Sequence, residues 1–104
     1  MKIGIQTRGI NQDNMVREFI HRKITFALRR LDRNVESVAV RLEFGNPGTA
    51  SLGGVCHIDL KLIGAGEIHV FSNGLSASDC VLQATRKMEF AMLQSKRNEN
   101  PAPP

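Results

Sequence analysis

The sequence has no tryptophan and no tyrosine, and its large aromatic residues are five phenylalanines. These phenylalanines do not form a pair on one predicted strand, which argues against a sheet that stacks the bases of single-stranded RNA. No apolar run reaches the roughly 20 residues of a transmembrane helix. The segment Met1–Gln6 is too short and too alternating for a signal peptide. We therefore expect a cytoplasmic protein without a membrane partner.

Cysteine is also scarce, because only Cys56 and Cys80 are present. They do not form a CxxC pair, and each lies at an apolar-facing position of its predicted element. We interpret them as reduced core residues rather than as a disulfide, in keeping with a cytoplasmic location.

Sequence motifs for catalysis are missing as well: there is no G-x-S-x-G, no P-loop and no dinucleotide fingerprint. The segment Gly45–Gly54 is rich in glycine but lacks the Lys-Ser/Thr of a phosphate cradle, so a loop is the better interpretation. His57, His69 and Asp59 suggest a weak metal site at most, because a structural zinc site needs four closely spaced ligands. We expect solvated sheet residues there, and no enzyme, cofactor, metal or small-molecule substrate.

What is present is periodicity, which predicts six elements in one domain of residues 1–97, followed by a disordered tail at 98–104. Two segments have helical spacing: Asn14–Arg33, and a second that Ser76 or Ser78 can cap and that ends near Lys96. Alternating segments predict strands at 2–6, 37–44, 55–62 and 67–71. The order is β-α-β-β-β-α.

Each predicted strand has one apolar face and each helix one apolar stripe. The simplest arrangement that buries all of them is an α+β fold, in which two helices pack on one face of a four-stranded mixed sheet. We expect the first strand to pair parallel to the second through a right-handed crossover. The other sheet face stays open, and it carries Lys2, Arg41, His57, Asp59, Lys61 and His69.

The net charge of +4 favours an anionic partner, and basic residues gather on the outer sides of both helices. On the first helix, Arg22, Arg29 and Arg33 share the side opposite the apolar stripe, with Lys23 and Arg30 beside them. On the second helix, the residues off the stripe include Arg86, Lys87, Lys96 and Arg97. Side by side, these faces would form one cationic surface suited to structured RNA. A charged face kept only for solubility is the alternative.

Three apolar residues share the outward side of the second helix, namely Leu82, Phe90 and Leu93. An exposed apolar strip suggests a protein contact, such as a homodimer. The alternative is that this helix is more deeply buried than its spacing indicates.

The order of elements and several segments resemble the ribosome hibernation promoting factor family, which includes protein Y. The opening Met1–Gln6, the helical segment 16–24, the strand Gly53–Leu62 and the segment Arg86–Glu89 are each similar in kind to family segments. The resemblance covers residues 1–97. This chain has Ser78 and Phe90 where the family usually has Tyr and Arg.

The resemblance implies a translation inhibitor of stationary phase or stress, which binds rRNA in the tRNA and mRNA channel of the small ribosomal subunit. By matching position it implies phosphate contacts from Arg22, Lys23, Arg29, Arg30, Arg86 and Lys87. The alternative function is a regulatory or protein-interaction module on the same fold, which uses Leu82, Phe90 and Leu93.

Overall fold

The computed structural model describes residues 2–10, 13–31, 35–45, 53–64 and 66–99, with the side chains of 13, 30, 31 and 95–99 excepted. The six elements follow the predicted β-α-β-β-β-α order. They are β1 (Lys2–Arg8), α1 (Asp13–Leu31), β2 (Val35–Phe44), β3 (Gly54–Leu62), β4 (Gly66–Gly74) and α2 (Ala77–Glu99).

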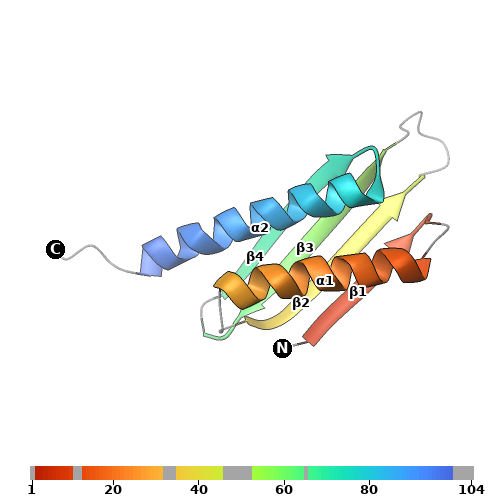
Figure 1. The fold of residues 1–104 in the computed structure, drawn as a ribbon. Coiled ribbons are helices and arrows are strands. Elements are labelled where there is room, and N and C mark those ends of the chain that lie inside the picture. Colours follow the sequence, from red (N-terminus) through yellow and green to blue (C-terminus); the bar gives the residue numbers. More distant parts are fainter. Residues whose placement is uncertain (1, 11–12, 32–34, 46–52, 65, 100–104) are drawn as a thin grey trace.

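The strands form one sheet in the order β1-β2-β3-β4, so β1 and β4 are its edges. β1 runs parallel to β2, whereas β2, β3 and β4 form an antiparallel meander. Both helices lie across the same face of this sheet, side by side (Figure 1). The predicted α+β architecture is therefore confirmed, including the mixed sheet.

The core lies between the helices and the sheet. Ile20, Ile24 and Leu28 of α1 are almost completely buried, and they belong to one apolar core with strand residues such as Leu42 and Ile58. From α2, the apolar side chains buried in this core are Cys80, Val81, Ala84, Met88 and Met92. The polar residue Thr85 is also buried, and its hydroxyl is satisfied there by donating a hydrogen bond to the Val81 carbonyl at 2.7 Å.

The element boundaries differ from those predicted by several residues. β1 continues past Gln6 because Thr7 and Arg8 still pair with Leu42 and Glu43 of β2. β2 begins at Val35, and α2 extends to Glu99, beyond the predicted end at Lys96. Asn98 and Glu99 are therefore helical, contrary to the tail predicted from Asn98 onward. The remaining tail residues and the centre of the Gly45–Gly54 loop lie outside the described residues.

The start of α2 is fixed to the sheet by polar contacts. Ser76 is the N-cap, because its Oγ accepts a hydrogen bond from the Asp79 amide at 3.1 Å. Ser72 Oγ donates to the Cys80 carbonyl at 2.6 Å, and Cys80 Sγ donates to the Gly54 carbonyl at 3.3 Å. Cys56 and Cys80 are free and buried, as the sequence predicted. No described helix is both long and apolar enough to cross a membrane.

Candidate nucleic-acid interface

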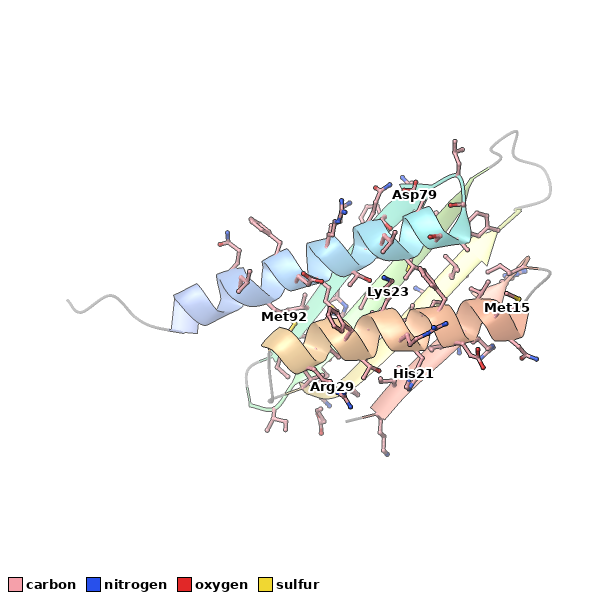
Figure 2. The ribbon with its side chains drawn as sticks, viewed as in Figure 1. Met15, His21, Lys23, Arg29, Asp79 and Met92 are labelled. Atoms are coloured by element: carbon pink, nitrogen blue, oxygen red, sulfur yellow. The ribbon has the colours of Figure 1, made fainter. Side chains whose placement is uncertain are left out.

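The outer surface of α1 carries the arginines that the helical spacing placed there. Arg22 and Arg29 are exposed, and neither has an ion-pair partner among the described residues. Figure 2 shows Arg29 and His21 on the side of α1 away from α2, whereas Lys23 points toward α2. The Lys23 ammonium lies 5.7 Å from the centre of the Phe19 ring, which is within cation–π range. These cations are therefore spread around the exposed part of the helix.

The predicted cations of α2 divide between two environments. Arg86 is exposed and has no ion-pair partner among the described residues. Lys87 instead reaches the edge strand β4, where its Nζ donates to the Phe71 carbonyl at 2.9 Å and lies 5.5 Å from the Phe71 ring centre. The charge of Lys87 is thus held over the β4 edge rather than on the outer surface beside Arg86.

Four further predicted cations have undescribed side chains. Arg30, Lys96 and Arg97 belong to the helices by their backbone, but their side chains lie outside the described residues. Arg33 lies outside them entirely. The described part of the predicted surface is therefore Arg22, Lys23, Arg29 and Arg86, with Lys87 at its margin.

The apolar strip of α2 is exposed, and so the alternative of a more deeply buried helix is wrong. Phe90 keeps 64% of its surface, Leu93 50% and Leu82 36%. Phe26 of α1, which the sequence analysis did not include, is also exposed at 63%. Large apolar groups thus lie among the cations on the helical side of the molecule.

The open sheet face has a polar network centred on His69. Its Nδ1 lies 2.6 Å from Asp59 Oδ1 and its Nε2 3.1 Å from Glu67 Oε2. These two hydrogen bonds, that to Asp59 above all, raise the pKa of His69 above its ordinary value. In the strand register, His69 is opposite Asp59, and His57 is opposite Phe71. The two histidines are therefore not directly paired, and the described residues contain no group of three or more His, Cys, Asp or Glu that could hold a metal.

One arginine of α1 has a contact that the sequence analysis did not predict. Arg17 Nη1 donates to the Ile5 carbonyl of β1 at 2.8 Å, so this side chain ties the helix to the sheet edge. The feature of the sequence that could have indicated this contact is the position of Arg17, three residues before Ile20 and at the border of the apolar stripe of α1. An arginine there packs its stem on the protein and extends its head group beyond it.

Two solved structures have the same fold as this chain. A ribosomal subunit interface protein from Coxiella burnetii superposes with a TM-score of 0.74 at 15% identity, covering 93% of this chain and 99% of that one. The Protein Y N-terminal domain from Thermus thermophilus gives a TM-score of 0.69 at 16% identity, with coverage of 88% and 96%. This chain therefore has their fold, as the sequence resemblance predicted. No family model and no curated protein sequence matches it.

Proposed function

We propose that this protein binds the small ribosomal subunit and inhibits translation by occupying the channel of tRNA and mRNA. The observation that carries the proposal is the exposure of Arg22, Arg29 and Arg86 on two neighbouring helices, without ion-pair partners among the described residues. A guanidinium group pairs with phosphate through parallel hydrogen bonds. The fold shared with a ribosomal subunit interface protein supports rRNA as the source of those phosphates.

Inhibition on this proposal needs no chemical step. A small rigid domain that is held in the channel excludes tRNA and mRNA by its volume alone. The contacts are to the RNA backbone, so binding responds to charge and shape more than to base sequence. The logarithm of the binding constant then falls linearly with the logarithm of the salt concentration, because each phosphate contact releases counterions.

The test is co-sedimentation with purified small subunits across a salt series. We expect wild-type binding that weakens with salt, and an Arg22→Glu/Arg29→Glu variant that binds at least ~10-fold more weakly. The matched control is Lys2→Glu/Lys61→Glu, which makes the same charge change on the open sheet face and should bind much better than the helix variant. No wild-type binding at low salt would refute the proposal. A bound protein that still admits tRNA would refute the channel site.

The exposed strip of Leu82, Phe90 and Leu93 favours a second function, which is contact with a protein partner or with another copy of this chain. Such an association would be insensitive to salt and would be abolished by Phe90→Glu, whereas Arg29→Glu would leave it intact. Analytical ultracentrifugation of the three proteins checks self-association directly. A monomer at all concentrations would exclude the homodimer.

A further inference from the structure

A hollow of about 430 Å³ lies where β1 and β2 end and is lined by residues from three elements. Three of the lining residues are arginines, Arg8 from β1, Arg17 from α1 and Arg41 from β2. Glu43 is the one carboxylate in the lining, so the formal charge of the hollow is +2. The volume falls within the range of about 300–1,000 Å³ that is usual for ligand sites.

The strand register explains why these charges converge. In the parallel pair of β1 and β2, Gln6 is opposite Arg41 and Arg8 is opposite Glu43. All four side chains are exposed, and each is out of phase with the buried strand residues, so they share the open face of the sheet. Arg17 arrives from the other face, and its hydrogen bond to the Ile5 carbonyl places its guanidinium at the β1 edge.

The arrangement is suited to an anion. Neighbouring like charges repel, and neither Arg8 nor Arg41 has an ion-pair partner among the described residues. Guanidinium groups present planar pairs of N–H donors that match phosphate oxygens, and the amide of Gln6 adds a neutral donor at the rim. A phosphate group entering the hollow would offset the repulsion and accept these hydrogen bonds.

A second hollow on the same sheet face provides a contrast. Its volume is about 270 Å³, and its charged lining consists of Lys2, Lys61, Asp59, Glu67 and His69. The two lysines are balanced by two carboxylates, both carboxylates are hydrogen-bonded to His69, and Lys61 lies 3.5 Å from Glu36. With Glu36 counted, three carboxylates balance the two lysines and a protonated His69, so that hollow has no excess of positive charge and the arginine hollow is the better site for an anion.

We propose that the hollow of Arg8, Arg17 and Arg41 is a phosphate-binding site that takes a backbone phosphate of the bound RNA. This inference rests on the proposed function, and it extends the RNA contact from α1 around the β1 edge onto the open sheet face. Free inorganic phosphate offers the same chemistry, and the experiment separates the two sources. Arg17 stays unchanged in the test, because it also holds the edge of β1.

The experiment measures affinity for small ribosomal subunits against salt for wild type and Arg8→Ala/Arg41→Ala. We expect roughly 10-fold weaker binding and a salt slope that is shallower by about one. Arg8→Lys/Arg41→Lys keeps the charge but loses the planar pairs of N–H donors of the guanidinium groups. This variant should bind more tightly than the alanine variant and more weakly than wild type. Lys2→Ala/Lys61→Ala removes the same charge from the balanced hollow and should bind as wild type does. Thermal melts confirm that each variant is folded.

Each other outcome decides a different point. If wild type binds but the Arg8/Arg41 variant does not differ from the Lys2/Lys61 control, the phosphate site is refuted and the helix contacts stand. If wild type does not bind subunits, the proposed function and the RNA site both fail. Inorganic phosphate titrated against ¹⁵N-labelled protein then decides what the hollow is. Shifts at Gln6, Arg8 and Arg41 that the variant lacks would support free phosphate as the ligand, and their absence would overturn any phosphate site.

Discussion

At the scale of single residues, what surrounds an arginine determines what it does in this protein. Arg17 is partly buried, and its hydrogen bond to the Ile5 carbonyl satisfies a backbone group of the edge strand β1. Arg22, only five positions further along α1, is exposed and has no such partner among the described residues. Replacing Arg17 would therefore disturb the attachment of α1, whereas replacing Arg22 changes the surface charge alone.

The two cysteines are core residues whose chemistry is suppressed by burial. Burial, together with the nearby Cys80, raises the pKa of Cys56 to about 12, and burial also raises the pKa of Cys80. At pH 8 the reactive thiolate of Cys56 would be present at about one part in ten thousand. We expect Ellman's reagent to modify the native protein at least ~100-fold more slowly than the chain unfolded in guanidinium.

The control for this prediction is Ala39→Cys, which places a thiol on the open sheet face at an exposed position. That thiol should react rapidly in the native state, while the two native cysteines remain protected. Rapid modification of wild type under native conditions would show that the core between β3 and α2 opens readily, contrary to the packing described above.

At the scale of elements, apolar periodicity was enough to predict the type and order of all six elements, because each has one side that is less exposed than the other. It did not predict their ends. β1 is longer than its alternating segment because its pairing with β2 continues to Arg8, and β2 is longer because Val35 still pairs with Leu62 of β3. The sequence also left two candidates for the cap of α2. The structure distinguishes them, because Ser76 accepts the amide hydrogen bond and Ser78 lies within the first helical turn.

The cap provides a prediction for the stability of α2. Ser76→Ala removes the acceptor for the Asp79 amide and should lower the free energy of unfolding by about 1 kcal/mol. Ser78→Ala is the matched control, because it deletes the same hydroxyl inside the helix and should change stability by less than ~0.5 kcal/mol. Urea denaturation of the three proteins checks this. Equal losses for the two variants would mean that Ser76 is not the effective cap.

At the scale of the whole molecule, the candidate surfaces were predictable to different degrees. The exposure of Arg22 and Arg29 could be predicted from the sequence of α1 alone, because the helical period determines which residues lie opposite the apolar stripe. The arginine hollow could not be found in this way. It requires the parallel register of β1 with β2 and the position of α1 over the β1 edge, which bring together residues as far apart in sequence as Arg8 and Arg41.

Arg22 and Arg29 lie on the helical side of the sheet, whereas Arg8 and Arg41 lie on its open face, and this separation leads to a prediction about the complete RNA contact. Arg22 and Arg29 share no described partner with Arg8 and Arg41. Losses of binding free energy at separate sites add to within about 0.3–0.5 kcal/mol. A variant with Arg22→Glu, Arg29→Glu, Arg8→Ala and Arg41→Ala should therefore lose the sum of the losses in the two double variants, measured by titrating labelled small subunits. If the combined variant binds no more weakly than the helix variant alone, the hollow does not contact the RNA independently of α1.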